Sequence, residues 1–238
     1  MKKIGLFYTV VRITIGVMFI LNVIGIFLLD NDSQQSRLVF NAVQSLLLLI
    51  VTILPGLIER KFKLNIPDFM EVIFIIMCIF HFILGEIGEF YIHVKWWDSM
   101  LHTLSGSMIA ILGYSLANSI DQDHNQNKLT PFFVSLFAVC FSVTIGVVWE
   151  VAEFLVDAFV GTNMQRYLIS DTLEPLVGRA ALVDTMKDLI LDTLGAIVIA
   201  IIGFIDMKNG REAFKNWILR REPESLESKS YIPDAKAS

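Results

Sequence analysis

The chain has 238 residues, of which 55% are hydrophobic and 18% charged, and its formal net charge is −5. A water-soluble domain usually has about 25% charged residues and just under 50% apolar ones, so this composition indicates a membrane protein. The acidic balance excludes a nucleic-acid binder, which needs a basic patch for the phosphate backbone. A secreted disulfide scaffold is excluded because there are only two cysteines, Cys78 and Cys140, both within apolar runs.

Six stretches along the chain are apolar and long enough to cross a bilayer, whose core of about 30 Å needs about 20 helical residues. These stretches are residues 4–29, 38–58, 69–92, 97–120, 131–160 and 183–206. The predicted fold class is therefore all-α, a polytopic transmembrane helical bundle of about six spans. The transmembrane domain takes residues 1–206, and residues 207–238 are expected to form a cytoplasmic interfacial helix and a disordered tail.

The orientation follows from Lys and Arg, which are more frequent in cytoplasmic loops. The first stretch follows Lys2 and Lys3, and it is too long for the apolar region of a signal peptide, about 7–15 residues, so we expect an uncleaved anchor. With the N-terminus inside, the cytoplasmic basic residues are Lys2, Lys3, Arg60, Lys61, Lys63, Lys128, Lys208, Arg211, Lys215, Arg220 and Arg221. The outer ones are Arg37, Lys95, Arg166, Arg179 and Lys187. Because the first group is larger, the N-terminus and C-terminus are both expected to be cytoplasmic.

Two features belong to the expected outer side. Tyr91, Trp96 and Trp97 are expected in an aromatic belt at the outer interface. Residues 161–182 form the longest outer loop, which is either a lid that lies along the interface or only a connector. We interpret it as a connector.

Ionisable side chains lie inside the spans, where a charge at mid-bilayer costs about 2.5–3.5 kcal/mol, so such residues usually face a protein interior and have a function. They are Glu86 and Glu89 in span three, Asp98 and His102 in span four, Glu150, Glu153 and Asp157 in span five, and Asp184, Asp188 and Asp192 in span six. Spacings of three and four place the residues of spans four, five and six on one face of their helix. All lie in the outer half, so the sequence predicts one polar chamber open to the outside.

Carboxylates crowded into one chamber need cations, protons or basic side chains to balance their charge. Carboxylates with an imidazole suit Zn²⁺, Mn²⁺ or Fe, and carboxylates alone suit Mg²⁺ or Ca²⁺. We therefore expect a divalent metal, Zn, Mn or Mg, as the cofactor. The expected metal ligands are His102, Glu150, Glu153, Asp188 and Asp192.

The remaining candidates have catalytic or binding roles. Glu86 or Glu89 is a candidate general base, Asp98 is expected to orient His102, and Asp184 is a further catalytic candidate. Arg166 and Arg179 are candidates for binding a substrate, because a guanidinium can hold a phosphate with two hydrogen bonds.

Several of these residues also have a structural interpretation. His81 is interpreted as a hydrogen-bonded packing residue, and Asp98, Asp157 and Asp184 lie near span ends where water or a helix N-terminus could satisfy them. Residues 104–113, with Gly195 and Gly203, are interpreted as small-residue packing faces, which let transmembrane helices approach closely.

Three pieces of the sequence together carry a family resemblance: D-x3-H at Asp98 to His102, the acidic pair Glu150 and Glu153, and D-x3-[ND]-x2-G-A beginning at Asp188. In order and spacing they resemble VanZ-like membrane proteins and, more closely, a YjdF-type group of bacterial inner-membrane proteins. The likeness covers about residues 65–205, and it departs at Asp192, where the VanZ-like pattern usually has Asn.

The resemblance implies a multi-pass protein of the bacterial plasma (inner) membrane, and the association of VanZ with glycopeptide resistance implies an envelope context. The arginine that VanZ-like proteins have before their last motif corresponds to Arg179, with Arg166 as the alternative.

The leading functional hypothesis is a metal-dependent enzyme that acts on an envelope lipid or lipid-linked substrate at the outer leaflet. The first alternative is a proton- or cation-coupled transporter, because intramembrane carboxylates and histidines form proton relays. The second is a non-catalytic membrane scaffold in which the acidic network only fixes helix packing. Membrane lipids are the expected partners, and the sequence assigns neither the reaction nor the oligomeric state.

Overall fold

The computed structural model describes residues 3–62, 64–123, 129–169, 172–210 and 220–221. The described elements are, in chain order, α1 (Lys3–Leu28), α2 (Asp32–Val51), α3 (Leu54–Phe62), β1 (Leu64–Asn65), α4 (Asp68–Ile79), the π-helix η1 (Phe80–Ile87), α5 (Phe90–His93), α6 (Trp97–Asp123), α7 (Pro131–Val160), the 3₁₀-helix η2 (Gly178–Leu182), α8 (Val183–Lys208) and β2 (Arg220–Arg221). The two short strands pair antiparallel.

Six helical segments of the described chain are long and apolar enough to cross a membrane. They are Gly5–Leu28, Asp32–Lys61, Asp68–Ile87, Trp97–Ala117, Pro131–Val160 and Gly178–Lys208. The predicted all-α bundle of six spans is therefore confirmed. The interfacial helix and tail expected for residues 207–238 fall mostly outside the described residues, because α8 continues to Lys208 and only residues 209–210 and 220–221 are described beyond it.

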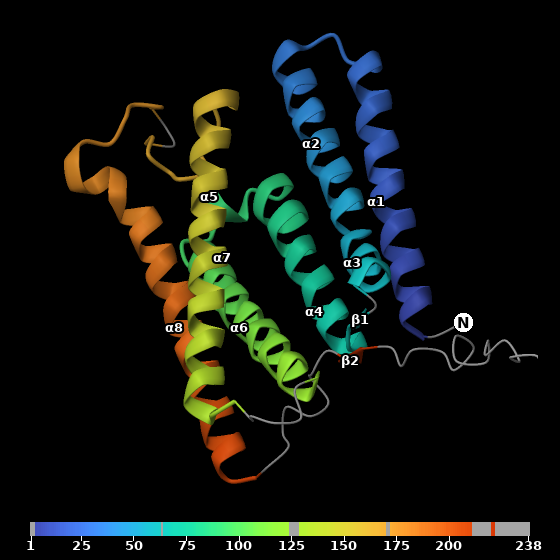
Figure 1. Cartoon of the computed structure of the whole chain (residues 1–238). Helices are drawn as coiled ribbons and strands as arrows, with labels where there is room; N and C mark the ends of the chain where they lie inside the picture. The colour runs from blue at the N-terminus through green and yellow to red at the C-terminus, as the bar shows by residue number, and fades with distance from the viewer. Residues whose placement is uncertain (1–2, 63, 124–128, 170–171, 211–219, 222–238) are drawn as a thin grey trace, which may run out of the picture.

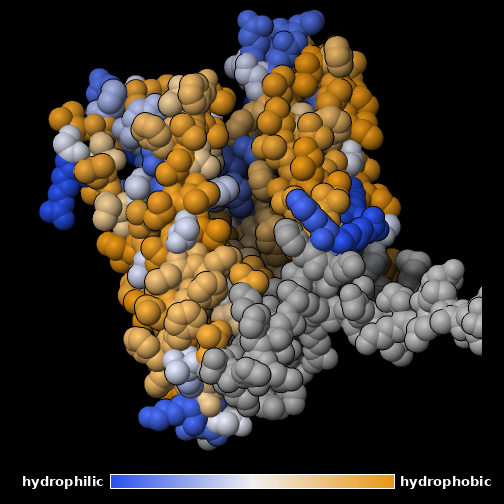
Figure 2. Space-filling model, viewed as in Figure 1, coloured by the Kyte–Doolittle hydropathy of each residue, from blue (hydrophilic) through white to orange (hydrophobic). Residues whose placement is uncertain are grey.

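The bundle has two parts, which Figure 1 shows side by side. Helices α6, α7 and α8 pack against one another, and α1 pairs with α2. Helix α4 and η1 connect the two parts, since η1 contacts both α2 and α6. The surface over the helices is largely apolar (Figure 2), as expected for side chains that face lipid.

The second span begins at Asp32, six residues before the predicted 38, because Asn31 caps its first turn. The Asn31 side chain accepts hydrogen bonds from the backbone nitrogens of Ser33 and Gln34, which satisfies donors that a helix start leaves free. The same span is interrupted after Val51. There the guanidinium of Arg12 donates to the hydroxyl and carbonyl oxygens of Thr52, at 3.1 and 2.7 Å.

Small residues let α6 and α8 cross at very short range. A Cβ atom added at Gly106 would overlap the backbone of Asp192, and one added at Gly195 would overlap the carbonyl oxygen of Thr103. Helix α7 joins the same crossing, because the Ser142 hydroxyl donates to the Gly106 carbonyl at 2.8 Å. These contacts confirm the small-residue packing face, and they bring the polar faces of α6 and α8 together.

The aromatic residues near the start of α6 have different environments. Trp96 is 60% exposed, in agreement with the predicted outer belt, but Trp97 is only 5% exposed. The Trp97 ring packs against Phe80 and Phe90, with centroid distances of 5.5 and 4.8 Å. Its assignment to the belt was therefore wrong, because the indole instead fills the junction of η1, α5 and α6.

Candidate functional site

His102 lies at the centre of a group of ionisable side chains contributed by α6, α7, α8 and the loop that joins α7 to α8. We call this group the polar cluster. Its members are Asp98, His102, Glu150, Glu153, Arg166, Asp184, Asp188 and Asp192. The structure therefore brings together most of the site residues predicted from the sequence.

The two nitrogens of the His102 ring face different carboxylates. Nδ1 lies within hydrogen-bond distance of Asp192 Oδ2, at 3.3 Å, and the other oxygen of Asp192 accepts from the Ser105 hydroxyl at 3.0 Å. Nε2 lies 3.7 Å from Asp98 Oδ1 and 3.9 Å from Asp188 Oδ2. Asp192 therefore orients the ring, and Nε2 faces the other two carboxylates.

Asp98, His102 and Asp188 each offer one ligand atom, and these atoms lie within 4.8 Å of one another. This spacing is close enough for one cation to contact all three. The sequence predicts an orienting role for Asp98 and a ligand role for Asp192, whereas the geometry favours the opposite assignment. The spacing along α6 alone could not distinguish these roles, because both carboxylates lie next to the same ring.

Three buried oxygens of the cluster have no hydrogen-bond partner in the described part of the chain: Asp98 Oδ2, Glu150 Oε1 and Asp188 Oδ1. Arg166 Nε lies 4.0 Å from Asp98 Oδ2, and Lys187 Nζ lies 4.0 Å from Asp188 Oδ1. An unpaired buried carboxylate oxygen is costly unless a cation or hydrogen-bond donor satisfies it. The donor set of two carboxylates and one imidazole therefore fits a divalent cation such as Zn²⁺ or Mn²⁺.

The loop between α7 and η2 supplies the basic side chain of the cluster. Arg166 Nε lies 3.7 Å from Asp184 Oδ2 and 4.0 Å from Asp98 Oδ2. Its Nη1 donates to the Tyr91 carbonyl at 2.8 Å, and the guanidinium lies over the Tyr91 ring. The interpretation of residues 161–182 as only a connector was therefore incomplete, because this loop forms part of the site.

Arg166 has a φ of 48°, in the left-handed region that residues with a side chain rarely adopt. Asn163 stabilises this turn, since its side chain accepts from the Leu168 nitrogen at 2.9 Å and donates to the Leu168 carbonyl at 3.1 Å. Such backbone strain persists only where the surrounding contacts fix it, and it is concentrated at functional sites. The turn directs the Arg166 side chain back onto the cluster.

Asp157, at the end of α7, anchors the same loop and is only 6% exposed. Its carboxylate accepts hydrogen bonds from the Thr162 hydroxyl and from the backbone nitrogens of Met164 and Gln165, at 2.5, 2.7 and 2.9 Å. The structural interpretation of Asp157 is thus supported, although its partners are loop groups rather than water or a helix N-terminus.

We expect Asp157→Asn to loosen this loop, because an amide nitrogen replaces one acceptor oxygen. A hydrogen bond to a charged group contributes about 1.5–3 kcal/mol to stability, so losing one of these bonds favours an open conformation of the loop. Limited proteolysis of the purified protein should show faster cleavage within residues 161–169. Asp30→Asn, at an exposed aspartate before α2, is the control and should be cleaved at the wild-type rate; equal rates for both variants would contradict the anchoring role.

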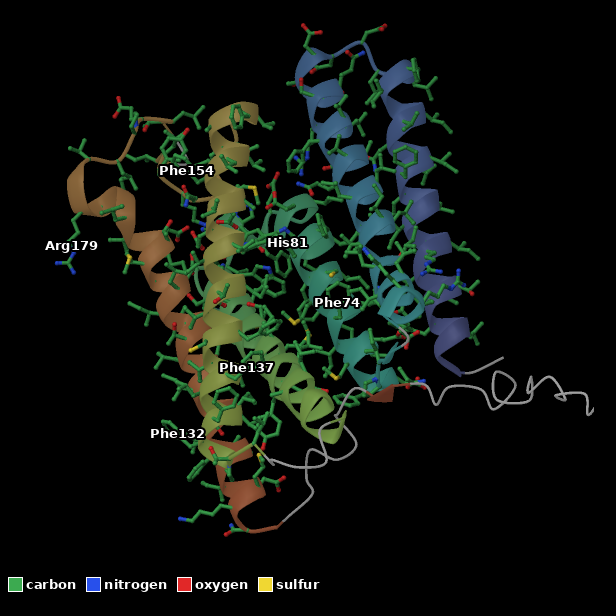
Figure 3. All side chains as sticks on the ribbon, viewed as in Figure 1. Phe74, His81, Phe132, Phe137, Phe154 and Arg179 are labelled. Carbon is green, nitrogen blue, oxygen red and sulfur yellow. The ribbon has the colours of Figure 1, made fainter. Side chains whose placement is uncertain are left out.

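The remaining predicted residues lie farther from His102. Glu89 turns away, because its carboxylate pairs with Arg37 at 2.9 Å and with His93 at 3.3 Å. Glu86 is half-buried on η1 and interacts electrostatically with Arg166 and Asp98. Arg179 is exposed and points away from the bundle in Figure 3. Of the two basic candidates, only Arg166 reaches the cluster.

His81 lies next to the cluster and packs as predicted. Its Nδ1 lies 2.5 Å from the Tyr91 hydroxyl, and its ring meets that of Trp149 edge to face. Burial raises the pKa of the Tyr91 phenol, so the hydroxyl stays protonated and can donate to His81. The ring of Tyr91 also covers Gly85, where an added Cβ would overlap it. Tyr91 thus links η1 to Arg166.

Two polar residues of the structure were not among those predicted from the sequence. Gln165 Nε2 lies 3.4 Å from Glu150 Oε2 and 3.1 Å from the Thr185 hydroxyl, so it joins the loop to α7 and α8. The available sequence signal for Gln165 was its position next to Arg166, in the loop that joins α7 to α8. Asp206 is a buried carboxylate near the C-terminal end of α8. It was not predicted because the residues before it form a long apolar run.

Comparisons with known proteins agree with this architecture. Residues 8–209 match the model of a family described as "Predicted membrane protein (DUF2238)". An "Uncharacterized protein" of Thermotoga maritima is 28% identical over 147 residues, which cover 61% of this chain and 67% of the relative. No solved structure matches the chain. Because the family model spans nearly all six membrane helices, the chain belongs to the DUF2238 family of predicted membrane proteins.

Proposed function

We propose that this protein binds a divalent cation at Asp98, His102 and Asp188 and uses it to act on the polar head of an envelope lipid or lipid-linked substrate. The observation that carries the proposal is the convergence of three ligand atoms within 4.8 Å, from two different helices. Asp188 is only 2% exposed and His102 8%. Charged groups are rarely buried at this depth without a function.

The chain's own groups suit a substrate that carries negative charge. A bound cation would polarise a phosphate or carbonyl oxygen, or activate a water molecule. Arg166 lies beside the proposed ligands and is 35% exposed at its side chain, so it can bind an anionic group next to the cation. Asp192 keeps the His102 ring oriented. Of the two predicted general bases, Glu86 and Glu89, we favour Glu86, which interacts electrostatically with Asp98 of the proposed site.

We further propose that the family is of the YjdF type and is related to VanZ-like proteins, with its place in the bacterial inner membrane. The support is that two of the pieces that carry the resemblance meet in space, because His102 of the D-x3-H piece contacts both Asp188 and Asp192. A proton- or cation-coupled transporter remains the alternative to an enzyme, and the following experiment separates the two.

The test combines metal analysis with a lipid assay. The protein is purified in detergent without chelator, and its Zn, Mn and Mg content is measured by mass spectrometry. It is then incubated with phospholipids and isoprenyl phosphates, with and without each metal, and the lipids are analysed for products. We expect bound metal and metal-dependent lipid conversion in the wild type, and neither in His102→Gln.

Either of two results would overturn this function. Folded wild-type protein that contains and takes up no metal would exclude the cation site. Metal-loaded protein that converts no lipid but carries cations across proteoliposomes would exclude the enzyme in favour of the transporter. Asp68→Asn, at an exposed aspartate at the start of α4, is the matched control and should behave as the wild type.

A further inference from the structure

A second group of polar side chains lies outside the polar cluster, on one face of α2. Arg37, Asn41 and Gln44 follow one another at spacings of four and three residues, which places them on the same face of the helix. Arg37 Nη2 lies 2.9 Å from Glu89 Oε1, just beyond the end of η1. Because α2 also contacts η1, this polar face of α2 is turned toward η1.

The two amides of this face lie deep in the span and are unpaired. Since α2 begins at Asp32, Asn41 and Gln44 are about 14 and 18 Å along the helix, at about 1.5 Å per residue. Both residues are partly exposed, and no hydrogen bond joins either side-chain amide to another residue that the structure describes. Polar side chains in a membrane span are costly unless they face a protein interior or a polar cavity. These amides therefore need a polar partner that the described chain does not supply.

The surface is hollowed between the two parts of the bundle, and Figure 2 shows hydrophilic atoms inside this hollow and apolar side chains around it. Its walls are α2 and α7, with η1 between them (Figure 1), so we call it the α2–α7 hollow. On the α7 side, the Trp149 ring meets the His81 ring of η1 at a centroid distance of 5.6 Å. Because the helices run across the view, the hollow opens sideways, toward the lipid. η1 is a π-helix, a rare form that is frequent at functional sites.

Glu86 connects the α2–α7 hollow to the polar cluster. It lies on η1, is partly exposed, and interacts electrostatically with both Arg166 and Asp98. The Arg166 side chain is itself 35% exposed. Polar groups therefore continue from the face of α2, across η1, to a proposed ligand of the cation.

We propose that the α2–α7 hollow admits the phosphate-bearing head of a membrane lipid from the side, and that Asn41 and Gln44 bind this head on its path to the polar cluster. This inference rests on the proposed function and deepens it, because it names the substrate class and its entry. Amide and guanidinium nitrogens donate hydrogen bonds to phosphate oxygens, while the lipid chains stay against the apolar side chains around the hollow, as Figure 2 shows.

A second copy of the chain is a less suitable partner for these amides. Asn and Gln side chains do join transmembrane helices by hydrogen bonds, but such a contact needs a helix face that points out of the bundle. The ion pair between Arg37 and Glu89 turns this face of α2 toward η1 instead. A lipid head is small enough to enter between the two parts of the bundle.

The experiment places the full-length, chelator-treated protein in nanodiscs of phosphatidylethanolamine and phosphatidylglycerol. A trace phospholipid has a photoreactive diazirine either in its head or at the end of an acyl chain, and mass spectrometry identifies the labelled residues after irradiation. We expect the head probe to label α2 around Asn41 and Gln44. At Val17, which is 50% exposed on α1 and about 16 Å from the end of that helix, only the chain probe should react. A head-labelled isoprenyl phosphate forms a second arm, which distinguishes the two sources of a lipid phosphate.

Replacing both amides tests their part in binding. Asn41→Leu combined with Gln44→Leu should lower head-probe labelling about tenfold or more, because the hydrogen bonds of two amides to the head are lost. Asn22→Leu is the matched control and should be labelled as the wild type is, since the Asn22 amide donates to the Met18 carbonyl of its own helix at 2.8 Å. Labelling of the hollow by the chain probe alone, or equal head labelling in the double variant, overturns the proposal.

The labelling separates this inference from the function on which it rests, because it requires neither a bound cation nor turnover. Metal-dependent lipid conversion without head labelling of the hollow overturns the entry route alone. Head labelling in a protein that binds no metal and converts no lipid overturns the proposed function but supports the lipid-head site. A dimer in size-exclusion profiles that is lost in the double variant, without head labelling, overturns the proposal in favour of a second copy. The wild-type labelling pattern decides the question even if the double variant does not fold.

Discussion

Asp188→Asn is expected to abolish tight divalent-cation binding while the protein stays folded. The substitution preserves the shape of the side chain, but it removes the negative charge that faces His102 Nε2 at 3.9 Å and replaces one of the two carboxylate oxygens with an amide nitrogen, which cannot bind a metal. Loss of a group that only orients a metal ligand typically lowers affinity about 10–100-fold. Because we assign Asp188 as a ligand, the loss should exceed that range. This loss of affinity is measured by isothermal titration calorimetry of the chelator-treated protein with Zn²⁺ and Mn²⁺.

The same titration distinguishes a ligand from an orienting residue. Asp192→Asn keeps an acceptor oxygen for His102 Nδ1 and should lower affinity only within the range of about 10–100-fold given for orienting groups. Asp68→Asn, at an exposed aspartate at the start of α4, is the control and should leave the affinity unchanged. A larger loss in Asp192→Asn than in Asp188→Asn would contradict the assigned roles.

The second large effect concerns the crossing of α6 and α8. Gly106→Ala should destabilise the bundle, because an added Cβ would overlap the backbone of Asp192, which cannot move away as a flexible side chain could. Inserting a methyl group into a well-packed core costs about 1–3 kcal/mol, occasionally more. We expect the upper part of this range, because the overlap is with main-chain atoms. The measurement is thermal unfolding in detergent, followed by circular dichroism.

Gly16→Ala is the matched control for this prediction. Gly16 also lies within a membrane helix, α1, but an added Cβ there meets nothing within 4 Å. Alanine is favoured over glycine in a helix by about 0.5–1 kcal/mol, so this variant should be as stable as the wild type or slightly more stable. If both variants unfolded at the same temperature, the α6–α8 crossing would not depend on Gly106.

The sequence predicted the spans and the shared polar faces well because both depend on local regularities. Apolar runs of about 20 residues identify membrane helices, and spacings of three or four residues place side chains on one face. These rules placed Asp98 with His102 and Asp188 with Asp192. They could not show which carboxylate faces which ring nitrogen, because that depends on how closely α6 and α8 cross at Gly106 and Gly195.

The contribution of the loop between α7 and η2 could not be predicted for a different reason. Arg166 reaches the cluster through a left-handed turn and through a hydrogen bond to Tyr91, 75 residues earlier in the chain. Neither feature leaves a periodic signal, so the residues alone could not separate Arg166 from Arg179, and the family resemblance favoured Arg179, which points away from the cluster (Figure 3). The Asp157 carboxylate illustrates the same limit, since the residues that it anchors lie in an irregular segment.

The separation of the cluster along the chain has a consequence for biosynthesis. His102 and Asp192 are 90 residues apart, which corresponds to about 5–20 s of translation at about 5–20 residues per second. During that interval α6 is in the membrane with Asp98 and His102, while the aspartates of α8 have not yet been made. The last span therefore completes the polar interior, because it supplies the two aspartates that His102 contacts across the helix crossing.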